Sequence, residues 1–150
     1  MADGATIHAC AVLYEGRGVL VRGASGAGKS CLVLDLLDDA LARGRDAALI
    51  ADDRVVVGAA HGRLVARTPT TIAGLIELRG LGIVTLPYEP AAVIALVVDI
   101  EATLPPRMPE DEARFAVLDG LRLPCLRLWR DDRRAVLRVR NALRALDENP

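Results

Sequence analysis

Cysteine and aromatic residues are scarce in this 150-residue sequence. Aromatic side chains make up 3% of it, as one Trp, one Phe and two Tyr. The three cysteines, Cys10, Cys31 and Cys125, are widely spaced and form no C-x-x-C pair. An odd number at such spacing excludes a disulfide framework and a cysteine-rich zinc site, and it favours a reducing, cytoplasmic compartment. We expect Cys31 to be a small buried residue on a helix.

Long apolar runs and an excess of one charge are also missing. No apolar run reaches the ~18 residues that a membrane-spanning helix needs, and the net charge is −1. We therefore expect no membrane and no nucleic acid as partner. The first residues, Met-Ala-Asp-Gly, lack the basic and apolar regions of a signal peptide, so we expect no export leader. The apolar fraction of 52% is high, and the length suits one domain, residues 1–150, with a substantial core.

A glycine-rich loop stands out against this background. Residues 23–30 read G-A-S-G-A-G-K-S, which is the complete pattern G-x-x-x-x-G-K-S. An apolar segment typical of a strand, residues 18–21, precedes it, and a helical pattern over residues 29–43 follows. Strand, loop and helix in this order are the context in which the pattern predicts a phosphate-binding P-loop. The predicted nucleotide-binding residues are Gly23, Ala24, Ser25, Gly26, Ala27, Gly28, Lys29 and Ser30.

The residue types of this loop explain the prediction. Glycines allow a tight turn that points backbone N–H groups at an anion, and the start of the helix adds its positive dipole end. Lys29 is placed to reach the β- and γ-phosphates, and the Ser30 hydroxyl is a ligand type that Mg²⁺ accepts. The sequence therefore predicts binding of a nucleoside triphosphate with Mg²⁺. Because aromatics are so few, we expect no large aromatic platform under the adenine.

Two adjacent carboxylates follow the next short apolar run. Residues 47–51 read A-A-L-I-A, and Asp52 and Asp53 come directly after them. If this run is a strand parallel to the one before the P-loop, its end lies at the same edge of the sheet. Adjacent strand residues point to opposite sides, so the two acids are predicted to differ in role. One would hold Mg²⁺ or its water, and the other would take a proton from an attacking hydroxyl. The alternative is a turn with two solvated acids.

A second pair of charged residues interrupts an apolar stretch further on. Glu77 and Arg79 lie two residues apart, which places them on the same side of an extended chain. Together they would supply a metal ligand and a phosphate clamp, although an ion pair on an edge strand explains them equally well.

The remaining segments alternate between strand and turn patterns. We expect a hairpin of residues 6–14 and 19–22, a second hairpin of residues 55–57 and 64–66, and a buried central strand over residues 91–100. A proline-rich loop over residues 101–112 contains Arg107, a candidate mobile contact. Strands over residues 113–118 and 124–129 and a helix over residues 131–147 complete the chain.

Four blocks of the sequence resemble the catalytic domain of bacterial HPr kinase/phosphorylase. They are Ile7-His8, the P-loop, residues 50–55 (I-A-D-D-R-V) and residues 77–83 (E-L-R-G-L-G-I). The last two, in this order and spacing, are far more specific than the P-loop, and the resemblance covers about residues 6–107. It implies an α/β fold of the phosphoenolpyruvate carboxykinase-like type, with a mixed β-sheet and flanking helices. It also implies a hexamer.

The activity that this resemblance implies is Mg-ATP-dependent phosphorylation of a serine on HPr, the phosphocarrier of the phosphotransferase system. Many members of the family also remove that phosphate by phosphorolysis. Asp53 matches the proton acceptor, and His8 and Lys29 match other active-site positions. Ser30 and Glu77 match the magnesium ligands. The residue pattern itself adds Asp52 as a metal ligand and Arg79 as a phosphate clamp, and by resemblance Arg107 matches a further catalytic arginine.

The sequence departs from the family pattern in three places. It has no counterpart of the N-terminal domain of long members, so the resemblance is to the short form. The segment between Ser30 and Asp53 is longer than in the family. The late V-R-P-G-R-N-like segment linked to phosphorolysis is not found around residues 124–130, which leaves the kinase better supported than the phosphorylase.

Two other functions are compatible with the P-loop. A small-molecule P-loop kinase would need a lid with paired arginines, which the strand-rich residues 55–84 fit poorly. A non-catalytic ATP-sensing module would keep the P-loop without needing Asp53.

Overall fold

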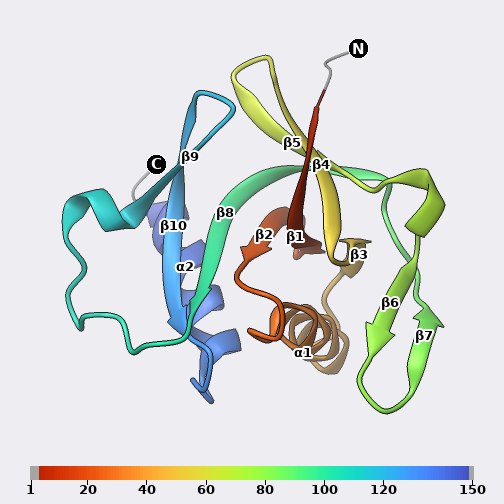
Figure 1. The fold of residues 1–150 in the computed structure, drawn as a ribbon. Helices are drawn as coiled ribbons and strands as arrows, with labels where there is room; N and C mark the ends of the chain where they lie inside the picture. Colours follow the sequence, from red (N-terminus) through yellow and green to blue (C-terminus); the bar gives the residue numbers. More distant parts are fainter. Residues whose placement is uncertain (1–3, 149–150) are drawn as a thin grey trace.

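The computed structural model describes residues 4–148 as a mixed β-sheet with two α-helices (Figure 1). The helices are α1 (Lys29–Ala42) and α2 (Ala135–Glu148), and two short 3₁₀ helices are η1 (Thr70–Ile72) and η2 (Asp111–Arg114). The strands are β1 (Ala5–Tyr14), β2 (Arg17–Arg22), β3 (Ala47–Ala51), β4 (Arg54–Ala60), β5 (Arg63–Arg67), β6 (Leu75–Leu78), β7 (Gly82–Thr85), β8 (Ala91–Glu101), β9 (Phe115–Leu118) and β10 (Leu121–Trp129).

Two long strands, β1 and β8, each serve two parts of the main sheet. The first half of β1 pairs with β4, and its second half pairs with β2 and β3. Likewise, the start of β8 pairs with β5, and its later residues pair with β2 and β10. Figure 1 shows β8 curving from the side of β5 to the side of β10. The sheet therefore bends back on itself and encloses a second core.

Alternating side chains send two sets of apolar residues to opposite faces. On β1, Cys10 and Val12 face the helices, whereas Ala9 and Ala11 face the β4–β5 hairpin. This period of two is what a pleated strand produces. The first core lies between the sheet and the buried faces of α1 and α2, and the second lies inside the bend of the sheet.

Four strands end at one edge of the sheet, and this edge positions the candidate site. Strand β2 runs parallel to β8, and β8 runs parallel to β10. Strands β2 and β3 both pair antiparallel with β1, so they also run in one direction. The predicted common edge for the P-loop and the Asp52-Asp53 pair is confirmed. The sequence did not reveal that β1 lies between the two strands, because the helical crossover passes over it.

The hairpins over residues 5–22 and 54–67, α1 and the central strand β8 are confirmed. Three predictions need correction. Residues 113–114 belong to η2, and β9 begins only at Phe115. The last helix begins at Ala135, because Asp132 accepts the backbone N–H of Arg134 at 2.8 Å and forms a turn before it. Cys31 is exposed rather than buried.

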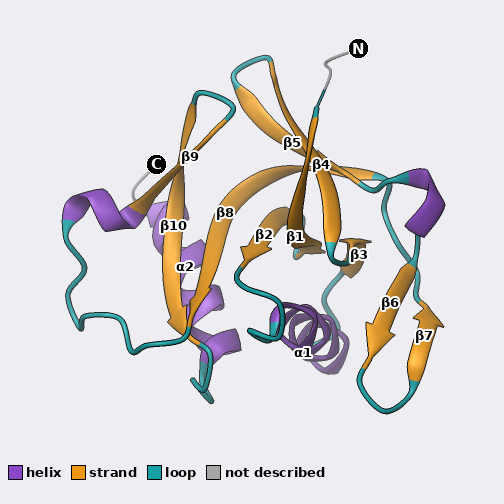
Figure 2. Cartoon of the chain, viewed as in Figure 1, coloured by secondary structure: helices purple, strands orange, loops and turns teal. Residues whose placement is uncertain are grey.

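The small sheet of β6 and β7 is set apart from the main sheet (Figure 2). Within residues 4–148, we find no helix with the length and apolar character needed to cross a membrane.

Candidate active site

The P-loop connects β2 to α1 in the way that the sequence predicts. Gly26 and Gly28 have φ angles of 80° and 102°, which favour glycine, and Gly28 is the residue before the first turn of α1. The buried Lys29 side chain donates to the carbonyl oxygens of Gly23 at 2.9 Å and Ala24 at 3.1 Å. Its ammonium group therefore lies inside the P-loop, where a phosphate would bind.

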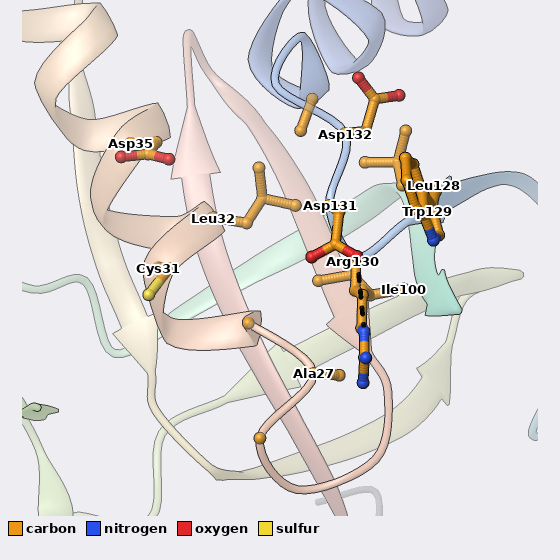
Figure 3. A pocket seen from close by; sticks show the side chains of 13 residues that line it. Ala27, Cys31, Leu32, Asp35, Ile100, Leu128, Trp129, Arg130, Asp131 and Asp132 are labelled. Atoms are coloured by element: carbon orange, nitrogen blue, oxygen red, sulfur yellow. Dashed lines mark ion pairs between the residues drawn. The ribbon is translucent and has the colours of Figure 1, made fainter. Parts of the chain in front are cut away.

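A pocket of about 370 Å³ opens beside this loop (Figure 3). The loop residues Gly26 to Gly28 form one wall, the first turns of α1 form the second, and the turn between β10 and α2 forms the third. Sequence reasoning did not identify this pocket, because its third wall comes from residues 128–135, about a hundred positions after the P-loop.

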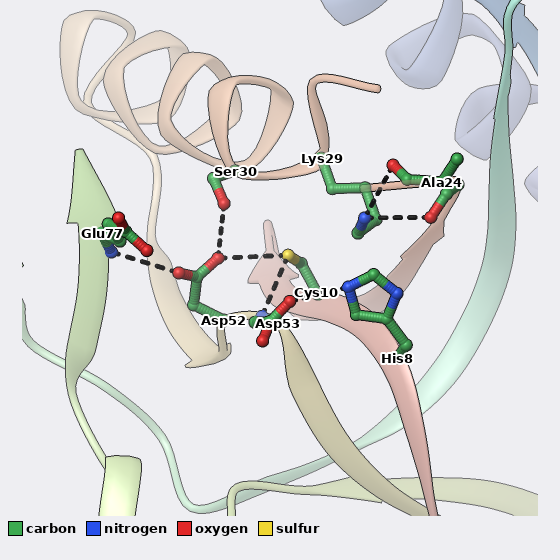
Figure 4. A network of polar contacts seen from close by, with 9 residues as sticks. His8, Cys10, Ala24, Lys29, Ser30, Asp52, Asp53 and Glu77 are labelled. Atoms are coloured by element: carbon green, nitrogen blue, oxygen red, sulfur yellow. Dashed lines mark hydrogen bonds and ion pairs between the residues drawn. The ribbon is translucent and has the colours of Figure 1, made fainter. Parts of the chain in front are cut away.

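The Asp52 carboxylate joins three elements (Figure 4). It is 8% exposed and accepts the Ser30 hydroxyl at 2.6 Å. It also accepts the Cys10 thiol at 3.2 Å and the backbone N–H of Glu77 at 3.1 Å. Burial raises the pKa of Cys10 to about 12, so this thiol keeps its proton and acts as a donor. The Asp52 carboxylate thus connects the first turn of α1 with strands β1 and β6.

The neighbouring Asp53 lies in a different environment. Its backbone adopts φ 67°, a left-handed conformation that aspartate tolerates better than most residues. This turn sends its side chain away from Asp52, and the side chain is 65% exposed. His8 Nε2 lies 2.7 Å from Asp53 Oδ1, a hydrogen bond in which the carboxylate accepts. The predicted difference between the two acids is therefore visible in their burial and partners.

Cys10 is a site residue that sequence reasoning missed. Besides donating to Asp52, its sulfur accepts the backbone N–H of Asp53 at 3.4 Å. A signal was present, because Cys10 lies two residues after His8 and therefore on the same face of β1.

The donor set around Ser30 fits a magnesium ion. Mg²⁺ prefers oxygen ligands and is held in phosphoryl-transfer sites by one or two carboxylates together with phosphates and water. The Ser30 hydroxyl and the Asp52 carboxylate provide such oxygens, 2.6 Å apart. In the part of the chain that the structure describes, no group of three or more His, Cys, Asp or Glu side chains is arranged to hold a metal. A magnesium ion here would need the phosphates of a nucleotide to complete its coordination.

Glu77 and Arg79 are separated by the geometry of a hairpin. Glu77 lies on β6 and reaches Asp52 through its backbone N–H, while its own carboxylate is exposed. Arg79 lies after the end of β6, in the turn before β7. The extended backbone on which the shared side was predicted therefore ends at Leu78, because Gly80 adopts φ 83° and reverses the chain.

Arg107 lies apart from the residues described so far. It is exposed on the loop after β8 and lines a different cavity of about 740 Å³, to which no P-loop residue contributes. Its assignment to the active site stays a prediction.

Comparisons with known proteins agree with this arrangement. Residues 1–89 match the family model described as the HPr Serine kinase C-terminal domain. The HPr kinase/phosphorylase of Halalkalibacterium halodurans is 38% identical over 109 residues, which is 67% of this chain and 33% of that protein. The HPr kinase/phosphorylase of Clostridium tetani is 36% identical over 87 residues, which is 58% of this chain and 27% of that protein.

A solved structure is similar over nearly its whole length. The Hpr(Ser) kinase/phosphatase from Coxiella burnetii superposes with a TM-score of 0.75 over 95% of this chain and 96% of that one, at 23% identity. This likeness establishes the fold. The chain spans about a quarter to a third of the length of the curated relatives named above. The match of more than half of its residues to one family model shows that the chain belongs to the HPr serine kinase C-terminal domain family.

Proposed function

We propose that this chain is a single catalytic domain that transfers the γ-phosphate of Mg-ATP to a serine of an HPr-type phosphocarrier protein in the cytoplasm. The observation that carries this proposal is the exposed His8–Asp53 pair, which stands beside a P-loop whose Ser30 is bonded to Asp52. The relatives bear names that state this activity, and they share the domain in which the pair lies.

Phosphate binding falls to the P-loop and Lys29. The backbone N–H groups at the start of α1 face the anion, and Lys29 exchanges its contacts with the Gly23 and Ala24 carbonyls for phosphate oxygens. Bound Mg-ATP supplies the phosphoryl group and the divalent charge that offsets its negative charge. Ser30 and Asp52 would hold the metal, and Glu77 on β6 would supply a further carboxylate.

Asp53 is the proposed base. It accepts the proton that the serine hydroxyl loses as the serine oxygen bonds to phosphorus and ADP departs. His8 holds Asp53 Oδ1 at 2.7 Å, and no described contact occupies Oδ2, which is the oxygen we assign to the proton. The side chains of Asp53 and His8 are 65% and 44% exposed, so a protein substrate reaches them without opening the domain.

The two arginines have supporting roles in the proposed reaction. Arg79, at the tip of the β6–β7 hairpin, is assigned to the transferred phosphate, and Arg107 is assigned to the acceptor protein. A hexamer follows from family resemblance alone, and it would place neighbouring domains around the acceptor.

The substitution Asp53→Asn tests this function. Asn keeps the size of the side chain and tolerates positive φ, but it is not a base. We expect Mg-ATP to bind within twofold of the wild type, whereas transfer to HPr falls by about 10²- to 10⁴-fold, the usual contribution of a general base. Transfer at the wild-type rate would contradict the role of Asp53. Intact ATP binding without transfer in the wild type would instead support the ATP-sensing module.

A further inference from the structure

The pocket beside the P-loop has the size and the position of a nucleoside site. Its volume of about 370 Å³ lies at the lower end of the range for small-molecule sites, ~300–1,000 Å³. Its floor is aliphatic, built from Leu32, Ile100 and Leu128, which are at most 9% exposed. One end is the P-loop itself, so a ligand anchored there by phosphates would extend into the pocket.

One face of α1 forms a continuous wall of this pocket. Gly28, Cys31, Leu32 and Asp35 all line it, and their spacing of three, four and seven residues puts them on the same side of a helix. At 1.5 Å per residue, Asp35 lies about 10 Å along the helix from Gly28. This interval leaves room for a ribose between the phosphate-binding amides and the Asp35 carboxylate.

The opposite wall provides a flat cation. Arg130 follows β10, its backbone N–H is held by the Glu101 carbonyl at 2.9 Å, and its side chain reaches toward Ala27 of the P-loop (Figure 3). A guanidinium plane stacks on aromatic faces, so Arg130 can cover a base from one side while the aliphatic floor covers it from the other. This arrangement needs no large aromatic platform.

Asp35 differs from the other carboxylates of the pocket in having no partner. Asp131 lies 3.8 Å from Arg130, and Asp132 accepts from Arg138 and from the backbone of Arg134. The Asp35 side chain is exposed, and within residues 4–148 it makes no hydrogen bond and no ion pair. An ionised carboxylate only accepts hydrogen bonds, so it selects a ligand edge that donates.

We propose that this pocket holds the base of the nucleoside triphosphate and that Asp35 accepts a hydrogen bond from the exocyclic amino group of a purine. This inference rests on the proposed function, because the phosphates must first be anchored by the P-loop. Asp35 then decides which base is preferred, separately from the phosphate contacts of Lys29 and Ser30.

The direction of the Asp35 pKa agrees with this assignment. Partial burial and then the neighbouring Asp38 carboxylate raise the pKa of Asp35. A hydrogen-bond donor in the ligand would favour the ionised form of Asp35.

A thermodynamic cycle, in which the protein and the ligand are each changed alone and then together, tests the assignment. The ligands are ATP and purine riboside 5′-triphosphate, which lacks only the amino group, and affinities are measured by calorimetry with Mg²⁺ present. We expect the wild type to bind ATP about tenfold more tightly, the effect of one hydrogen bond to a charged acceptor. In Asp35→Ala, the two affinities should agree within twofold. Leu41→Ala, an exposed position on the same helix outside the pocket, should keep the wild-type preference.

The outcomes separate this inference from the proposed function. Equal binding of both nucleotides by the wild type, or an undiminished preference in Asp35→Ala, would overturn the role of Asp35. Inorganic tripolyphosphate serves as the probe of the P-loop alone. If it binds as tightly as ATP, the nucleoside pocket is wrong while the P-loop stands, and if neither ligand binds, the proposed function fails with it.

Discussion

At the scale of single residues, two adjacent carboxylates have taken on different environments. The Asp52 carboxylate is buried and accepts three hydrogen bonds, whereas the Asp53 carboxylate is exposed and meets His8. The difference arises because the strand ends at Ala51 and Asp53 turns into the left-handed region. The proposed metal ligand, Asp52, has the first environment, and the proposed base, Asp53, has the second.

The substitution Asp52→Asn should destabilise the fold more than Asp53→Asn. An amide side chain has one acceptor oxygen, so at least one of the donors from Cys10, Ser30 and Glu77 would face an NH₂ group. A buried donor without an acceptor costs about 1–3 kcal/mol. We expect a loss of this size in the free energy of unfolding, measured by urea titration.

Asp53→Asn is the matched control for that measurement. Its side chain is exposed, so the expected change lies within about 0.5 kcal/mol. Equal losses in both variants would show that the burial of Asp52 does not set its contribution to stability.

At the scale of elements, the P-loop depends on the strand that precedes it. Arg22, the last residue of β2, donates twice to Asp99 on β8, at 2.7 and 2.9 Å. The Cys125 thiol on β10 donates to the same carboxylate at 3.4 Å. This Arg22–Asp99–Cys125 cluster joins β2, β8 and β10 just before Gly23, so it helps to fix the direction in which the loop leaves the sheet.

Removing the Asp99 carboxylate from this cluster should lower the stability of the fold and weaken phosphate binding. Asp99→Ala leaves the Arg22 guanidinium without its bidentate partner. A hydrogen bond to a charged group contributes about 1.5–3 kcal/mol to stability. Since Arg22 is one-third exposed, we expect a loss of about 1–2 kcal/mol in unfolding free energy and weaker binding of tripolyphosphate. Asp131→Ala is the control and should change stability little, because among the described residues Asp131 has one ion pair, which spans 3.8 Å at the surface. An Asp99→Ala variant with unchanged stability and binding would show that the loop needs no such support.

The sequence predicted the elements whose signals are local. The P-loop with its helix and the hairpins ending in glycine turns are examples, because glycine spacing and alternating apolar residues mark them directly. The shared roles of β1 and β8 were not predicted, since pairing between distant strands leaves no local pattern. The start of α2 was missed because Asp132 uses its side chain for a turn, which helical periodicity alone does not register.

For the candidate site too, features with a local signal were predicted and contacts between distant residues were not. The positions of Asp52, Asp53 and Ser30 at one sheet edge could be predicted from strand direction. His8 entered the candidate site only through family resemblance, and its contact with Asp53, 45 residues away, was not predicted. Cys10 and the pocket wall at Arg130 were not predicted, because each depends on tertiary packing.

At the scale of the whole molecule, two cysteine thiols and one tyrosine hydroxyl make the stability of the fold depend on pH. Burial raises the pKa of Cys10 and of Cys125 from 9.0 to about 12, and burial together with Asp39 raises that of Tyr14 from 10.0 to about 12. Groups with raised folded-state pKa values stabilise the protein below the unfolded values and lose that contribution as pH rises toward the folded values.

We therefore expect stability to fall between pH 9 and pH 12. For the buried Cys10, the slope is at most about 1.4 kcal/mol per pH unit. Urea titrations at several alkaline pH values measure it, and Cys125→Ala should give a shallower fall. A free energy of unfolding that stays constant to pH 11 would contradict the burial of these thiols in the folded state.

The molecule as a whole combines the proposed nucleoside pocket beside the P-loop with the exposed Asp53 carboxylate, which is the proposed base. The central claim is that the two act together on a protein serine. The most direct test is the intact mass of HPr after incubation with this protein, Mg²⁺ and ATP, followed by removal of ATP and addition of inorganic phosphate. Our account predicts one added phosphate on a serine of HPr in the first step. An unchanged HPr mass, with ATP binding demonstrated in the same sample, would contradict it.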